Sequence, residues 1–161
     1  MITKKLAYVA LIFGLTVANV PRVAADTGST ARLAVVVAKN FPVDNLSFAD
    51  LKRLYMGDTI EASGKRVIPL ALRMRSPERT TFDESVIGLA PDDVARYWVD
   101  RKIRGQSGPP KAIDSPLTLL RLVDKLDGSL GYVRADAVPS DVKVLRIDGK
   151  RPSDPGYRLS I

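Results

Sequence analysis

Apolar residues gather in four short segments of the chain that have the length and composition of strands. Residues 33–38 (LAVVVA) form the clearest of them, because they are apolar without a break and rich in β-branched side chains. Such a run is typical of a strand that is buried on both faces of a parallel or mixed sheet. Gly131, within the segment 129–133, indicates a close approach of other atoms to the backbone there. The other three segments are 67–72, 129–133 and 142–147.

Between these strands the apolar residues recur at helical spacing. Three of the four predicted helices begin at a serine, which favours a helix N-terminus, and the other begins at Ala90 with a proline and two acids in its first turn. Each ends near a glycine or a group of cations. Trp98, in the third helix, is expected to anchor the core rather than to hold a ligand. The predicted helices run from Ser47 to Gly57, from Ser76 to Gly88, from Ala90 to Arg104 and from Ser115 to Gly128.

The order of the elements is β-α-β-α-α-α-β-β, followed by a polar tail over 148–161. Strands that are interleaved with helices predict an α/β domain in which helices cover a sheet. We therefore expect a mixed, largely parallel sheet flanked by helices. The loop 105–110 (GQSGPP) does not predict a phosphate cradle, because no strand leads into it and no GK[ST] follows it.

The chain opens with the three-part pattern of a secretory signal peptide. A basic start over 1–5 precedes an apolar run over 6–20, and small residues then offer a cleavage site before Asp26. The run is shorter than the roughly 20 residues of a membrane span, which favours cleavage over the alternative of an uncleaved anchor. We expect residues 1–25 to be removed and residues 26–161 to form one exported α/β domain in the periplasm.

The chain contains no cysteine and no histidine. This composition excludes disulfides, thiolate metal sites and catalysis by Cys or His, and a zinc site would depend on carboxylates alone. The adjacent acids Asp83-Glu84 and Asp92-Asp93 do not make a catalytic pair, since neighbours on a helix point about 100 degrees apart. We expect no enzyme activity, no cofactor and no metal site.

The formal net charge of +7 falls to +4 when Lys4, Lys5 and Arg22 leave with the leader. This modest positive balance suits a small anionic ligand or an anionic envelope surface. The basic residues are interleaved with acids and aromatic residues are few, so nucleic acid is not an expected partner.

The stretch 67–86 (VIPLALRMRSPERTTFDESV) holds the candidate ligand site. A strand there runs into a helix that begins at Ser76, and a helix N-terminus offers free N–H groups and a partial positive charge to an anion. Arg73, Arg75 and Arg79 stand around this point and could pair with the anion's charge. Two alternatives stay open: an ordinary helix start with solvated arginines, and an Arg79 that pairs with an internal acid.

Four segments also carry motifs of a known protein family, in that family's order. They are 45–57 (NLSFADLKRLYMG), 67–82 (VIPLALRMRSPERTTF), 128–133 (GSLGYV) and 148–157 (DGKRPSDPGY). The segments resemble those of phosphate-binding proteins of ABC transporters, which have the type II periplasmic binding protein fold. The resemblance implies the fold of one lobe of such a protein and a ligand of the phosphate or related oxyanion class.

The resemblance transfers a set of binding residues to the start of the predicted helix after 67–72. Two-lobed members of the family are longer, and the lobe with their Gly/Ser/Thr-rich phosphate loop has no counterpart in this sequence. The transferred residues are Arg73 or Arg75, Ser76 and Arg79, with Thr80 beside them.

Two residues of the candidate site depart from the family's Ser-Gly-Thr pattern. Pro77 stands in place of the glycine and donates no N–H, while Glu78 stands in place of the threonine and competes for the positive end of the helix. We therefore expect weak binding, with millimolar to high micromolar affinity, or roughly −4 to −6 kcal/mol.

Two hypotheses for the function follow. The first is an exported solute-binding protein that holds phosphate or a related oxyanion weakly and is linked to phosphate transport. The second is an interaction or adaptor module of the envelope that uses the half-fold as a scaffold and binds no ligand. Its partner would be an envelope transporter, a sensor protein or a second copy of the chain.

Overall fold

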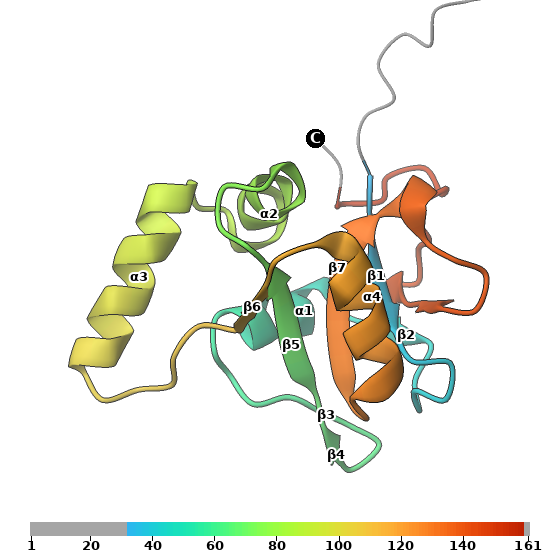
Figure 1. Ribbon diagram of the computed structural model, residues 1–161, viewed down its shortest axis with the longest axis horizontal. Helices are drawn as coiled ribbons and strands as arrows, with labels where there is room; N and C mark the ends of the chain where they lie inside the picture. Colours follow the sequence, from blue (N-terminus) through green and yellow to red (C-terminus); the bar gives the residue numbers. More distant parts are fainter. Residues whose placement is uncertain (1–31, 160–161) are drawn as a thin grey trace, which may run out of the picture.

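The computed structural model describes residues 32–159, and its centre is a five-stranded mixed sheet. The strand order is β6-β5-β7-β1-β8, and β1 alone runs against the other four (Figure 1). The mixed α/β fold predicted from the sequence is confirmed. The strands of this sheet are β1 (Leu33–Val37), β5 (Ile68–Leu72), β6 (Lys111–Ile113), β7 (Ser129–Arg134) and β8 (Lys143–Val144).

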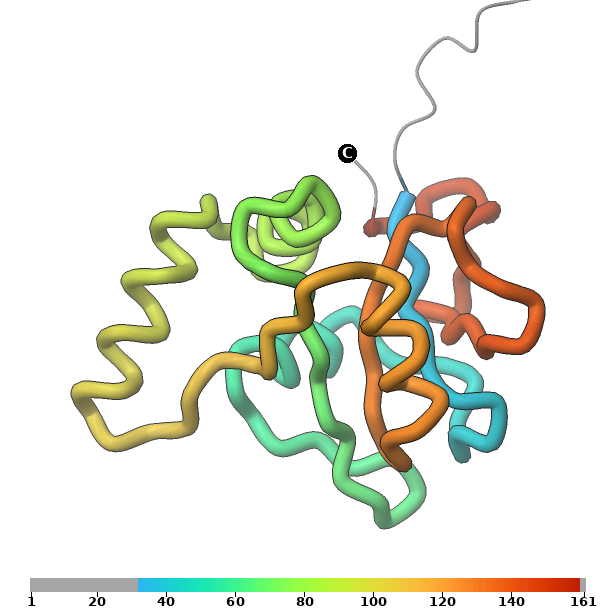
Figure 2. Tube along the Cα trace, in the orientation of Figure 1, coloured from blue at the N-terminus to red at the C-terminus, as the bar shows by residue number. Residues whose placement is uncertain are grey.

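Helices cover both faces of this sheet. In Figure 1, α4 lies in front of the sheet and α1 behind it, while α2 lies beyond the end of β5 and α3 stands at one side. The tube in Figure 2 shows the same course, with the long connection from α3 leading back into the sheet. The helices are α1 (Phe48–Tyr55), α2 (Pro77–Phe82), the π-helical turn η1 (Asp83–Ile87), α3 (Pro91–Ile103), α4 (Pro116–Lys125) and the 3₁₀ turn η2 (Ala135–Ala137).

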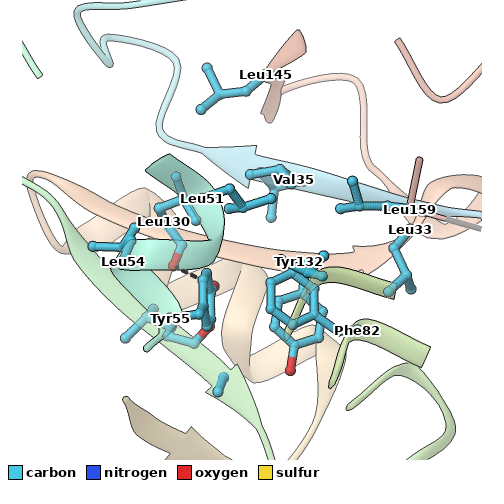
Figure 3. Close-up of a cluster of buried hydrophobic side chains, with 14 of the residues drawn as sticks. Leu33, Val35, Leu51, Leu54, Tyr55, Phe82, Leu130, Tyr132, Leu145 and Leu159 are labelled. Carbon is cyan, nitrogen blue, oxygen red and sulfur yellow. Dashed lines mark hydrogen bonds between the residues drawn. The ribbon is translucent and has the colours of Figure 1, made fainter. Parts of the chain in front are cut away.

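The core forms where β1 and β7 pack between the helical layers. All five residues of β1 are buried, as its unbroken apolar run predicts. The rings of Tyr55, Phe82 and Tyr132 come together from α1, α2 and β7, as Figure 3 shows. Phe82 stacks on Tyr132 with the ring centroids 3.9 Å apart and the planes 7° from parallel. This aromatic cluster joins both helices to the centre of the sheet.

The predicted elements occur, with three local differences. The segment 142–147 is not one strand, because buried Leu145 separates β8 from β9 (Arg146–Ile147), which pairs instead with β2 (Asn45–Leu46). A hairpin of β3 (Glu61–Ala62) and β4 (Lys65–Arg66) and the short strand β6 lie in segments expected to be loops. Strands of two or three residues depend on their partners rather than on a pattern of their own.

Two further expectations concern single residues. Trp98 is buried, so its predicted role as a core anchor is confirmed. Gly131 is closely approached, but by a side chain: a Cβ at this glycine would lie 2.5 Å from Cδ2 of Leu119 on α4. The glycine thus lets α4 pack directly on β7.

The predicted leader, 1–25, and residues 26–31 after it lie outside the described residues. Within residues 32–159, none of the helices has the length and apolar character needed to cross a membrane.

Candidate functional site

The candidate site is the turn between β5 and α2, residues 73–76, at the carboxyl end of β5. Its position is fixed by the neighbouring strand, because the Arg73 N–H donates to the carbonyl of Ile113 at 2.9 Å. The Ser76 N–H then donates to the carbonyl of Arg73 at 3.2 Å and closes the turn. Ligands of open α/β sheets bind outside the carboxyl ends of the strands, so the turn lies at the edge where a ligand is expected.

Ser76 caps α2 as the sequence predicts. Its backbone is extended, and its Oγ accepts a hydrogen bond from the Arg79 N–H at 3.3 Å. Pro77 fills the first helical position and has no N–H. The Arg79 N–H is already bonded to the cap, so among the first three residues of α2 only the N–H of Glu78 remains available to an anion. This helix start offers little more than one backbone donor to an anion.

Two of the predicted arginines reach solvent from the turn. Arg73 is exposed, and in the described part of the chain its guanidinium has no hydrogen-bond or ion-pair partner. Arg75 has a φ of 65°, a conformation that non-glycine residues seldom adopt, and its Nη2 donates to Asp92 at 3.1 Å. Both ends of that pair are exposed, so it contributes little to stability and leaves Arg75 available to another anion.

The Arg79 side chain points into the core, away from the outer surface of the turn. Its Nε donates to both carboxylate oxygens of Asp83 at 2.8 Å, and its Nη1 donates to the carbonyl of Leu72 at 3.4 Å. The two side chains are only 5% and 1% exposed. The role that the sequence left open for Arg79 is therefore the internal one, a pair with an acid.

Burial shifts the pKa of one member of this pair and of a tyrosine beside it. Burial raises the pKa of Asp83 above its ordinary value, and the adjacent Arg79 guanidinium opposes that rise. Burial also raises the pKa of Tyr132, whose hydroxyl lies beside Arg79 and the Leu72 backbone without a hydrogen bond of normal geometry.

Thr80, the last predicted site residue, is half-buried in the first turn of α2. Its N–H donates to the carbonyl of Ser76 at 2.9 Å, as an ordinary helical residue does. The structure thus places Arg73, Arg75 and Ser76 together at the outer surface of the turn, turns Arg79 inward, and leaves Thr80 half-buried on the helix beside them. Among residues 32–159, no group of three Asp or Glu residues is placed to hold a metal ion.

Asp83 is the residue that the sequence analysis did not assign to this site. Two signals pointed to it: its distance of four residues from Arg79, and its position between apolar residues that face the core, Phe82 and Val86. Asp83 is also the first residue of the π-helical turn, which extends α2 to Gly88 through a hydrogen bond from the Gly88 N–H to the Asp83 carbonyl at 2.7 Å. π-turns of this kind often occur at functional sites.

By sequence, neither a family model nor a curated protein matches the chain. Solved structures do match it by fold. An ABC-type phosphate transport receptor from Vibrio cholerae superposes with a TM-score of 0.64 and 20% identity, over 81% of this chain and 53% of that one. A putative phosphate ABC transporter substrate-binding protein from Clostridium perfringens, solved with bound phosphate, superposes with a TM-score of 0.62 and 20% identity, over 76% of this chain and 47% of that one. PstS from Borrelia burgdorferi superposes with a TM-score of 0.62 and 9% identity, over 81% of this chain and 54% of that one.

These likenesses establish the fold. The architecture expected from the resemblance to phosphate-binding proteins is confirmed. The chain spans about half the length of each of the three matched structures.

Proposed function

We propose that this chain, which shares its fold with about half of a phosphate transport receptor, is an exported solute-binding protein that holds phosphate or a related oxyanion weakly at the 73–76 turn. The observation that supports this most is the Arg73 guanidinium, which has no partner among residues 32–159 and lies beside a capped helix start at the carboxyl end of β5. Arg73 and Arg75 would pair with the anion's charge, and the Ser76 hydroxyl would donate to it.

The inner residues have a supporting part in this proposal. Arg79 holds the carbonyl of Leu72, the last residue before the turn, while its charge is already neutralised by Asp83. Arg79 therefore fixes the position of the turn through the end of β5 and does not contact the ligand. Thr80 lies at the margin of the site, where a larger oxyanion would meet its side chain.

The geometry gives three reasons to expect a low affinity for the anion. Pro77 removes one donor, the Ser76 cap occupies another, and Arg75 must leave Asp92 to reach the ligand. Both arginines stand in water, where a charge pair contributes about 0–1 kcal/mol. A dissociation constant in the high micromolar to millimolar range follows, or roughly −4 to −6 kcal/mol.

Replacing Arg73 and Arg75 together with glutamine is expected to weaken phosphate binding about five- to tenfold, because each exposed cation contributes about 0–1 kcal/mol to its pairing with the anion. Titration calorimetry at low salt measures the effect, since salt screens exposed charges. Arg121→Gln, at an exposed arginine on α4, is the control and should bind as the parent does. Equal affinities for the double variant and the control would remove this turn from the site.

The test avoids Arg79 by design. Its replacement would leave Asp83 buried without a partner, and a loss of binding would then report unfolding. Arg73 and Arg75 are exposed, so their variants keep the fold and isolate the electrostatic contribution.

Export and transport form the second part of the proposal. The basic start, apolar run and small residues of 1–25 would direct the chain to the periplasm, where phosphate-binding proteins deliver their ligand to an envelope transporter. The intact mass of the exported protein, beginning at Asp26, tests the cleavage.

A second candidate function is an adaptor of the envelope that binds a protein at the same edge. It is favoured by two exposed apolar side chains, Met74 in the turn and Leu117 at the start of α4. Such side chains stabilise protein interfaces rather than oxyanion sites. No phosphate binding, together with a defined dimer in sedimentation or a captured transporter or sensor protein, would support this function over the first.

A further inference from the structure

A hollow of about 380 Å³ opens at the other end of β5 from the 73–76 turn. One wall consists of residues 66–69, which lead into β5 and form its first two positions, and Leu54 of α1 lies beside them. The opposite wall is the segment 107–110, which runs from α3 to β6 at the lower left of Figure 1. None of the five predicted oxyanion-site residues lines it, so the hollow is separate from the proposed phosphate site.

The hollow exists because β6 is shorter than its neighbour. Lys111, the first residue of β6, pairs with Leu70, so within residues 32–159 the part of β5 before Leu70 has no strand beside it on this side. The segment 107–110 passes there instead, at a distance that leaves space. Pro69 lies in this part of β5. Proline has no N–H to donate, and it is tolerated here because no strand on this side needs that hydrogen bond.

The wall opposite β5 is fixed in place by a chain of hydrogen bonds. Arg101 donates from Nη2 to Ser107 Oγ at 2.9 Å, and Ser107 Oγ donates to the carbonyl of Gly57 at 2.9 Å. Arg101 also donates to Tyr97 Oη at 3.1 Å, and Tyr97 donates to the carbonyl of Met56 at 2.8 Å. The wall is thereby tied to the end of α1 at two points.

Gly57 makes this attachment sterically feasible. It has a φ of 97°, and a Cβ there would lie 2.9 Å from Ser107 Oγ and 3.2 Å from Trp98. Only glycine allows Ser107 and Trp98 to approach the end of α1 this closely. The hollow is therefore largely formed before any ligand enters, which is typical of small-molecule sites.

The lining combines apolar walls with charge at the rim. Val67, Ile68 and the prolines at 69, 109 and 110 supply the apolar surface. Arg66 and Lys111 stand at the rim, are exposed, and have no ion-pair or hydrogen-bond partner for their charged ends in the described chain. The one acid in the lining, Asp58, is neutralised by Arg53 at 3.1 Å.

We propose that this hollow is a second binding site, for a small organic anion with an apolar body such as an aryl carboxylate or aryl phosphate. The apolar body would rest on Ile68 and the prolines, and Arg66 and Lys111 would pair with the anionic group. Inorganic phosphate lacks the apolar body, so it does not fill the site. The proposal stands independently of the phosphate site at the 73–76 turn.

Phenyl phosphate and benzoate, titrated into ¹⁵N-labelled full-length protein, test the proposal. The amides expected to shift are those near 66–69 and 107–111, with benzyl alcohol causing much smaller changes because it lacks the charge. Arg66→Gln combined with Lys111→Gln should weaken binding at least fivefold, and Arg121→Gln, at an exposed arginine of α4 that belongs to neither proposed site, should leave it unchanged. Shifts confined to 73–76, or equal binding by the double variant and the parent, would overturn it.

A second variant separates loss of the site from loss of the fold. Ile68→Glu places a like charge inside the hollow at a side chain that is 43% exposed, so it should abolish binding while the urea midpoint stays near the parent value. Inorganic phosphate bound at 73–76 should leave the phenyl phosphate titration of residues 107–111 unaltered. Undiminished binding by Ile68→Glu would place the anion elsewhere and contradict the proposal.

Discussion

Asp83→Asn is expected to lower the free energy of unfolding by about 3–5 kcal/mol, because it leaves the Arg79 guanidinium charged and buried without a counter-charge. The substitution keeps the shape of the side chain, so little of the loss comes from packing. Arg79 is bound by both oxygens of Asp83 at 2.8 Å, with the two side chains 5% and 1% exposed. Urea denaturation followed by circular dichroism gives the change from the transition midpoint at constant slope.

The chain provides a matched control on its surface. Asp100 and Arg104 have the same spacing of four residues and the same 2.8 Å distance, but their side chains are exposed. Asp100→Asn should therefore cost about 0.5 kcal/mol or less. Equal losses for Asp83→Asn and Asp100→Asn would show that burial does not govern the pair.

A double replacement completes the argument. Arg79→Met with Asp83→Leu removes both charges and fills the space with apolar atoms, so it should recover most of the stability that Asp83→Asn loses. If it does, the pair is retained for a reason other than stability. The hydrogen bond from Arg79 to the Leu72 carbonyl suggests that reason, since it sets the end of β5 and hence the 73–76 turn. A fully folded double variant that binds phosphate less well would support this interpretation.

The elements that the sequence predicts well are those with local causes. β1 is an unbroken apolar run, and the serine caps at 47, 76 and 115 each accept a hydrogen bond from the N–H three residues on. Each of these features is determined by a few consecutive residues. The family motifs added the fold of the whole, which no single segment could provide.

What the sequence could not predict depends on tertiary contacts. β6 is three residues long and is a strand only because β5 lies beside it, and β9 leaves the line of β8 to pair with β2. Val99 and Ile103 recur at helical spacing on α3, yet they are 60% and 80% exposed, because this helix has a layer on one side only. Periodicity identifies the helix but does not say which face will be covered.

The candidate site shows the same limit. An arginine at a helix start with an acid four residues later is a pattern found mostly on helix surfaces, and only rarely as a buried pair. The sequence therefore placed Arg73, Arg75, Ser76 and Arg79 at one turn, but it could not tell which guanidinium would point inward. The inward position of Arg79 depends instead on tertiary contacts, its bonds to buried Asp83 and to the carbonyl of Leu72.

Phe82→Ala is expected to lower the free energy of unfolding by about 3–5 kcal/mol, because Phe82 joins α2 to the rest of the aromatic cluster. Its ring is fully buried, stacks on Tyr132 at 3.9 Å and lies 4.5 Å from Tyr55. Removing it deletes both ring contacts and opens a cavity beside the buried Arg79–Asp83 pair. Urea denaturation measures the loss, and near-ultraviolet circular dichroism reports the altered environment of both tyrosines.

Phe82→Leu discriminates between the volume of the ring and its stacking. Leucine keeps most of the apolar volume but cannot stack, so its loss should be roughly half that of alanine or less. Val99→Ala, at the exposed face of α3, sets the baseline at about 0.5 kcal/mol or below. A loss for Phe82→Ala close to that baseline would mean that α2 is held by its backbone and the ion pair alone. The expected order, alanine well above leucine and leucine above the baseline, would instead mean that the cluster fixes α2. Because Arg79 lies on the same short helix, the cluster would then also help to hold Arg79 in its inward position.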